Sequence, residues 1–132
     1  MKFKSGLYAI LFVLVIHFVL LLMDGYGRFY QIDILMHLMG GFAWALIALA
    51  LETRVKSCFK KSLPTWYRYI FVAGFVLMIG VAWEFHEYAL DQTINIWYHI
   101  VPSQPSLADT MKDLLDDWIG ASAAFFLFQK KK

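Results

Sequence analysis

The stretch Ser106–Gly120, SLADTMKDLLDDWIG, sets four carboxylates at the head of an apolar segment that ends in three lysines. The acids are Asp109, Asp113, Asp116 and Asp117. At about 100° per residue, the first three fall within one narrow stripe of a helix and Asp117 lies at its edge. A carboxylate at the centre of a spanning helix costs roughly 2.5 to 3.5 kcal/mol, so this stripe cannot face lipid. We expect it to face a bundle interior or a watery cavity.

The composition indicates an integral membrane protein with a single domain, residues 1–132. Of the 132 residues, 61% are hydrophobic, and the mean hydropathy is +0.59, well above the range of a soluble domain of this size. The one cysteine, Cys58, excludes an internal disulfide. Because no basic stripe with interleaved aromatic residues is present, we expect membrane lipids as partners and no nucleic acid.

Four segments of the chain predict an all-α membrane protein built as a four-transmembrane-helix bundle. The spans are about 7–23, 33–51, 68–90 and 107–128, the last being the least apolar because its first half is acidic. Four spans place both termini on one side of the membrane. Ten of the twelve Lys and Arg residues fall at that side, which predicts cytoplasmic N and C termini.

This topology brings acidic faces from three helices to one depth. Asp33 and His37 are four residues apart at the start of the second span and share a face. Glu84 and Glu87, three residues apart, lie near the end of the third span. The acidic stripe of the fourth span begins at the same level, about 5 to 15 Å below the outer surface. We therefore expect a cluster of carboxylates with one imidazole near the outer face.

Two local signals concern packing and capping of these helices. Gly40 and Gly41 follow close to the Asp33–His37 face and would allow another backbone to approach. Ser106 is suited to cap the fourth span, with Asp109 at the third helical position. Capping accounts for Asp109 but leaves the acids further along the helix without an explanation.

Charge repulsion requires something to neutralise this cluster. Two carboxylates about 4 Å apart repel by roughly 4 kcal/mol at an effective dielectric of 20, so six or more cannot stay ionised and dry. A divalent metal ion, shared protons and a purely structural polar network are the three answers. Metal is the most economical, because carboxylates with one imidazole suit Mg²⁺, Mn²⁺, Fe²⁺ or Zn²⁺ in bundle cores. The predicted ligands are Asp33, His37, Glu84, Asp109 and Asp113.

The leading functional hypothesis is a metal-dependent membrane enzyme, of hydrolase or transferase type, acting at the outer leaflet. Its substrate would be lipid-linked or phosphate-bearing. The metal would activate a water and stabilise a developing oxyanion, while Glu87 or Asp116 carries the proton. Arg28 and Lys112 would bind an anionic headgroup, because they are the two basic residues expected on the outer side.

Two alternatives from other classes remain open. The acids can serve a cation- or proton-coupled transporter, which would have to work as an oligomer of identical chains because four helices enclose little pathway. They can also serve a non-catalytic accessory protein that binds a partner or an antibiotic. Flux through liposomes would favour the first alternative, and function retained after neutralisation of single acids would favour the second.

The ordered motifs of spans two to four resemble the VanZ-like and YjdF-like small membrane proteins of bacteria. They are D-x3-H (Asp33, His37), WE-x2-E-Y (Trp83, Glu84, Glu87, Tyr88) and D-x3-D-L-x-x-D-x3-G-A (Asp109, Asp113, Asp116, Gly120, Ala121). The likeness covers about two thirds of the chain. It implies a compact multi-helix protein of the bacterial inner membrane, and some VanZ-like members are linked to glycopeptide resistance. It implies no particular reaction.

Overall fold

A computed structural model describes residues 3–29, 31–56, 63–98 and 102–129. These residues are helical throughout, apart from short connections, and contain no strand. The helices are α1 (Phe3–Leu22), α2 (Gly25–Arg28), α3 (Gln31–Lys56), α4 (Thr65–Leu90), α5 (Ile96–Tyr98) and α6 (Leu107–Phe128), with a π-helical segment, η1 (Asp91–Asn95), between α4 and α5. The predicted all-helical class is therefore confirmed.

Three helical stretches of the described residues are long and apolar enough to cross a membrane: Phe3–Leu22, Gln31–Val55 and Thr65–Tyr98. Helix α6 has 22 residues, about 33 Å at 1.5 Å per residue, which is also sufficient to span. Helix α6 is less apolar than these three stretches, because its first half carries four aspartates and a lysine. The number of four spans and the cytoplasmic position of both termini therefore remain predictions.

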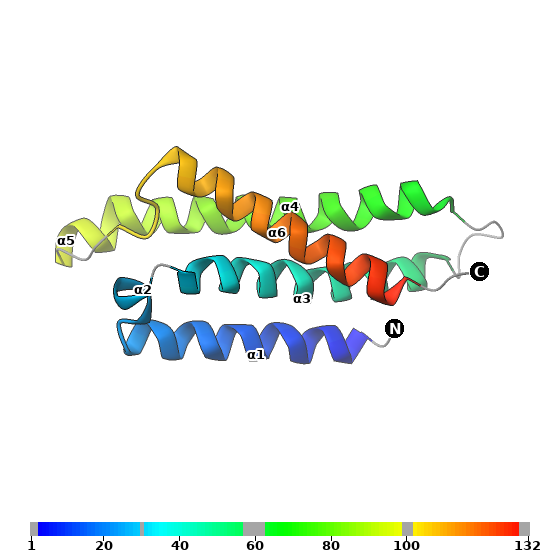
Figure 1. Ribbon diagram of the computed structural model, residues 1–132, viewed down its shortest axis with the longest axis horizontal. Helices are drawn as coiled ribbons and strands as arrows, with labels where there is room; N and C mark the ends of the chain where they lie inside the picture. Colours follow the sequence, from blue (N-terminus) through cyan, green and yellow to red (C-terminus); the bar gives the residue numbers. More distant parts are fainter. Residues whose placement is uncertain (1–2, 30, 57–62, 99–101, 130–132) are drawn as a thin grey trace.

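The long helices run alternately in opposite directions, and the start of α1 lies at the same end of the bundle as the end of α6 (Figure 1). Helix α3 is central, because it packs against α1, α4 and α6. Helix α6 crosses α3 and α4 obliquely (Figure 1). Helix α1 packs on α3 alone among the long helices, and Gly6 is its one buried residue.

The third helix extends past its predicted end near residue 90, through η1 to Tyr98. Asp91 stabilises this extension, because its carboxylate accepts hydrogen bonds of 2.8 Å from the backbone N–H groups of Ser103 and Gln104. The carboxylate thereby ties the connection that leads into α6. The Ser106 side chain accepts a hydrogen bond from the backbone N–H of Asp109, so the predicted N-cap of α6 is confirmed.

Glycines allow α3 and α6 to meet with their backbones in contact. A methyl group on Gly41 would overlap the backbone of Asp117, and one on Gly120 would overlap the backbone oxygen of Leu38 and crowd the backbone nitrogen of Phe42. The approach that Gly41 was expected to permit is therefore present. Toward the C-terminal ends of both helices, alanines and Phe125 continue the α3–α6 interface into the apolar core.

The end of the bundle opposite this crossing carries a balanced buried ion pair. The guanidinium of Arg68, on α4, donates through Nε and Nη2 to both carboxylate oxygens of Glu52, on α3. Both residues are buried, and the guanidinium also lies over the ring of Phe125 on α6. A bidentate pair of this kind compensates its own charge, so this end needs no further ion.

Replacing Gly120 with alanine should destabilise the protein, because the added methyl group forces α3 and α6 apart. Overpacking of this kind costs about 1 to 3 kcal/mol. Thermal unfolding in detergent micelles measures the effect. Gly74→Ala on α4 is the matched control, since a Cβ there meets no atom within 4 Å and gains the same helix propensity. Equal unfolding temperatures for the two variants would contradict the packing account.

Candidate functional site

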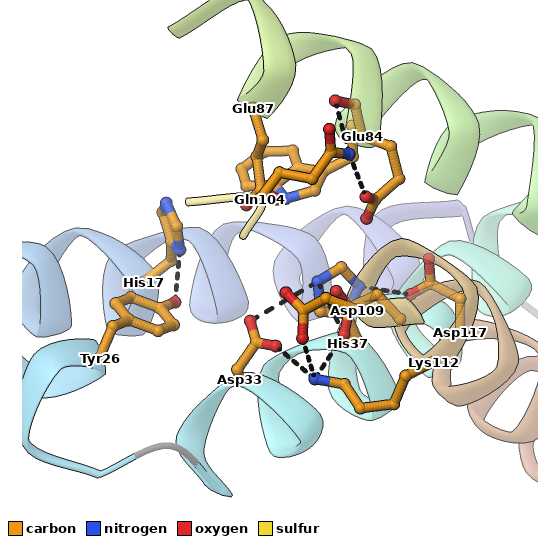
Figure 2. A network of polar contacts seen from close by, with 12 residues as sticks. His17, Tyr26, Asp33, His37, Glu84, Glu87, Gln104, Asp109, Lys112 and Asp117 are labelled. Atoms are coloured by element: carbon orange, nitrogen blue, oxygen red, sulfur yellow. Dashed lines mark hydrogen bonds and ion pairs between the residues drawn. The ribbon is translucent and has the colours of Figure 1, made fainter. Parts of the chain in front are cut away.

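His37 lies among buried carboxylates near the start of α3 (Figure 2). Its Nε2 atom is 3.8 Å from Asp33 Oδ1 and 3.9 Å from Asp113 Oδ1. Its Nδ1 atom is 3.5 Å from Asp117 Oδ1. Asp33 comes from the preceding turn of α3, whereas the other two acids come from α6 across the glycine crossing. The crossing therefore places carboxylates opposite both nitrogens of one imidazole.

Lys112 is the cation of this group. Its Nζ atom lies 2.9 Å from Asp33 Oδ2, 3.1 Å from Asp109 Oδ1 and 3.0 Å from Asp113 Oδ1. One ammonium thus faces three carboxylates and leaves most of their charge uncompensated. We name Asp33, His37, Asp109, Lys112, Asp113 and Asp117 together the His37 cluster.

Three members of the His37 cluster can each offer one ligand atom to a divalent ion: Asp33, His37 and Asp113. These atoms lie within 4.8 Å of one another. Ligands held about 2.1 Å from one ion are roughly 3 to 3.5 Å apart, so small side-chain rotations would close the set. Asp117, opposite Nδ1, matches the carboxylate that commonly orients a metal-bound histidine. The group is therefore chemically able to hold a metal ion.

Several buried acid oxygens at this end of the bundle lack a hydrogen bond from the described residues. They are Glu84 Oε1, Asp113 Oδ1 and Asp116 Oδ2. Asp113, only 2% exposed, does contact the Lys112 ammonium as an ion pair, but not with hydrogen-bond geometry. A buried acceptor without a partner costs about 1 to 3 kcal/mol. Glu84 Oε1 and Asp116 Oδ2 therefore call for a proton, a water or a cation, whereas Asp113 Oδ1 has the Lys112 ammonium beside it.

Glu84 is held by the connection that precedes α6. Its Oε2 atom accepts a hydrogen bond of 2.7 Å from the side-chain amide of Gln104, and the residue is 5% exposed (Figure 2). Gln104 is itself fixed through its backbone N–H by Asp91. Glu84 thus belongs to a network between α4 and this connection, and its hydrogen bond goes to Gln104 rather than to the His37 cluster.

Glu87 reaches the cluster through a cavity of about 100 Å³ between α1, α3 and α4. Asp33, His37, Asp117 and Glu87 all line this cavity. Trp83 Nε1 donates a hydrogen bond of 2.9 Å to Glu87 Oε1, which fixes one oxygen of the carboxylate. Glu87 therefore faces the same cavity as the imidazole and can exchange a proton with a molecule in it.

His17 and Tyr26 close the cavity on the side of α1 and α2. His17 Nδ1 is 2.6 Å from the Tyr26 hydroxyl, and its ring meets that of Trp83 edge-on with centroids 5.2 Å apart. Burial, aided by the charges of Asp33 and Glu87, raises the pKa of the Tyr26 phenol above its ordinary value. The phenol therefore stays protonated and can donate a hydrogen bond to His17.

The structure brings together part of the predicted site. The predicted residues that meet in the His37 cluster are Asp33, His37, Asp109, Asp113 and Lys112. Glu84 and Glu87 come from α4, the second by way of the cavity, whereas Asp116 is buried on α6 and does not line the cavity. Arg28 lies on α2, where it is exposed and pairs with Asp24 at 3.8 Å.

Sequence reasoning assigned no role to Asp117 or Gln104. Asp117 lies at the edge of the acidic stripe, and it reaches His37 because α6 crosses α3 obliquely where glycines bring the helices together (Figure 1). Gln104 belongs to an irregular connection, whose conformation no periodicity encodes. The sequence signal that could have found Asp117 is its position close to Gly120, because a small residue in a helix permits a neighbouring helix to approach closely.

Replacing Lys112 with methionine should lower stability, because three carboxylates lose their shared cation. The expected loss is roughly 1 to 3 kcal/mol, measured as the change in unfolding temperature in detergent. Lys4→Met, at an exposed position on α1, is the control for loss of one positive charge. If both variants unfold at the wild-type temperature, Lys112 does not hold the cluster together.

Comparison with known proteins places the chain in a family. Residues 1–132, the whole chain, match a family described as "Predicted membrane protein (DUF2238)". No match was found among curated proteins or among solved structures. The match agrees with the apolar helices of the fold and carries no assigned reaction. The chain therefore belongs to the DUF2238 family of predicted membrane proteins.

Proposed function

We propose that the protein binds a divalent metal ion through Asp33, His37 and Asp113. We further propose that it uses the ion for hydrolysis or group transfer on a lipid-linked or phosphate-bearing substrate. The observation that carries the proposal is the position of His37 Nε2, which faces the half-buried Asp33 and the buried Asp113, while the buried Asp117 faces Nδ1. Glu84 and Asp109 stay as further candidate ligands.

Asp33 offers different oxygens to His37 and Lys112, whereas Asp113 Oδ1 faces both of them, so Asp33 is the ligand that an ion and Lys112 could share without competing. Its Oδ1 faces His37 and its Oδ2 contacts the ammonium. Asp109 also pairs with the ammonium, at 3.1 Å. In this arrangement Lys112 keeps a positive charge next to the ion, where an anionic group of the substrate would bind. Arg28 would meet an approaching headgroup only from the exposed surface of α2.

A divalent ion held by Asp33, His37 and Asp113 would supply Lewis-acid activation of a water and of the substrate. Glu87 would take the proton of the attacking water and return it to the leaving oxygen, because Glu87 lines the same cavity as Asp33 and His37. In that exchange the water oxygen would form a bond to the phosphorus or carbonyl carbon of the substrate as the bond to the leaving oxygen breaks. Asp116 does not line the cavity, which favours Glu87 in this role.

The location is part of the proposal. Ten of twelve basic residues favour a fourth span in α6 and cytoplasmic termini, which would place the His37 cluster near the outer face of a bacterial inner membrane. The resemblance to VanZ-like and YjdF-like proteins supports a location in the bacterial inner membrane. Reporter fusions after Tyr26 and at the C terminus would test the orientation, with opposite sides expected.

Metal binding is tested on purified protein loaded with Mn²⁺ or Zn²⁺ and dialysed. We expect about one ion per chain by elemental analysis and a rise in unfolding temperature, because an ion that binds only the folded state stabilises it. Asp113→Asn should lose both effects, since it removes a ligand. Asp24→Asn, at an exposed carboxylate, should keep them. No bound ion in wild type, or equal binding by the two variants, would count against the metal site.

Glu87→Gln separates chemistry from metal binding. If Glu87 carries the proton, turnover should fall by about 10² to 10⁴-fold while metal content stays at the wild-type level. Phosphate release from phosphatidic acid and from a polyprenyl diphosphate in micelles provides the assay. Undiminished turnover would remove Glu87 from the mechanism. A matching loss of metal would make it a ligand instead.

A further inference from the structure

The cavity beside the His37 cluster is bounded by two helices that do not pack together. No Cα atom of α1 lies within 8 Å of one in α4, and both helices are apolar enough to span a membrane. His17 and Trp83 bridge them through their rings near the acidic end. Because both helices are expected to lie in the bilayer, acyl chains would be the medium outside the gap between them.

The lining of the cavity changes from polar to apolar along all three helices. The polar end is lined by His17, His37 and Glu87, and the apolar end by Ile10, Trp44 and Val76. These two sets are 7, 7 and 11 residues apart on α1, α3 and α4, which corresponds to about 10 to 16 Å along the helices. A phospholipid in one leaflet has the same gradient of polarity over the same direction.

Small residues of α3 leave space unfilled along one side of the cavity. Gly40 and Ala43 line it, and a Cβ on Gly40 would meet Asp117 Oδ1, at 3.9 Å, and no nearer atom of another helix. The space at Gly40 is therefore not filled by protein atoms. An apolar space of this kind offers water few partners, whereas a hydrocarbon chain can fill it and gains contacts with its walls.

We propose that this cavity takes a short segment of one acyl chain of a membrane phospholipid, which enters sideways between α1 and α4. The chain lies against Ile10, Trp44 and Val76, and its ester and phosphate groups lie at the end where His37 and Glu87 face the cavity. This inference deepens the proposed function, because it identifies the substrate class as a bilayer phospholipid. Lipid binding itself does not require the metal ion.

The ring bridge between His17 and Trp83 sets where the lipid enters. It spans the gap at the polar end, and Tyr26 holds His17 from the side of α2 at 2.6 Å. An acyl chain can therefore pass between α1 and α4 below the bridge without breaking a helix–helix interface. The headgroup must then meet the bridge, so these rings contact the lipid near its ester bonds.

The test uses the full chain in phosphatidylethanolamine vesicles that contain phosphatidylglycerol with a photoreactive diazirine in one acyl chain. Crosslinked residues are identified by mass spectrometry. We expect labelling of Trp44, which is partly exposed, and its loss in Gly40→Leu, whose side chain fills the cavity. Gly74→Leu is the matched control, because its Cβ meets nothing within 4 Å and it does not line the cavity. Labelling of exposed Phe126, on α6, should be the same in all three proteins.

Equal labelling of Trp44 in Gly40→Leu and Gly74→Leu would overturn the inference, as would its absence from the wild-type crosslinks. Gly40→Ala, whose methyl group makes an ordinary contact, should give a partial loss and serves if Gly40→Leu does not fold. Metal content is measured on the same samples. Lipid labelling without a bound ion would leave this inference intact and remove the proposed metal chemistry, whereas a bound ion without cavity labelling would do the reverse.

Discussion

Backbone contact between α3 and α6 is the constraint on which the His37 cluster depends. Gly41 and Gly120 let the two helices approach until a methyl group at either position would overlap the facing backbone. At that separation the acids of α6 come within 4 Å of the imidazole of His37. Any larger spacing would remove both contacts from α6 and leave Asp33 as the only partner of the ring in the cluster.

The two ends of the bundle solve the problem of buried charge in different ways. At one end Glu52 and Arg68 form a bidentate pair, which compensates its own charge and joins α3 to α4. At the other end acids from α3 and α6 surround one ammonium, that of Lys112. Repulsion between neighbouring carboxylates is worth several kcal/mol at this spacing. A protein gains nothing in stability from such an excess, so the acidic end is where we place the function.

The sequence predicted the helical fold, the shared face of Asp33 and His37, and the inward direction of the α6 stripe, because periodicity and the cost of charge in lipid act locally. It did not predict the angle at which α6 crosses α3, so Asp117 was left without a partner. It placed Lys112 at the site as a basic residue of the outer side, but not its contact with Asp33 on α3, because the reach of a flexible side chain depends on the facing helix. Gln104 lies in the connection before α6, which is held by hydrogen bonds to Asp91 and whose conformation follows no sequence periodicity.

Coordination of a divalent ion by His37 is the central claim, and electron spin echo modulation of bound Mn²⁺ tests it most directly. The account predicts nitrogen modulation from one coordinated imidazole in the wild-type protein and its disappearance in His37→Gln. Bound Mn²⁺ with no nitrogen modulation, or modulation unchanged in His37→Gln, would contradict it.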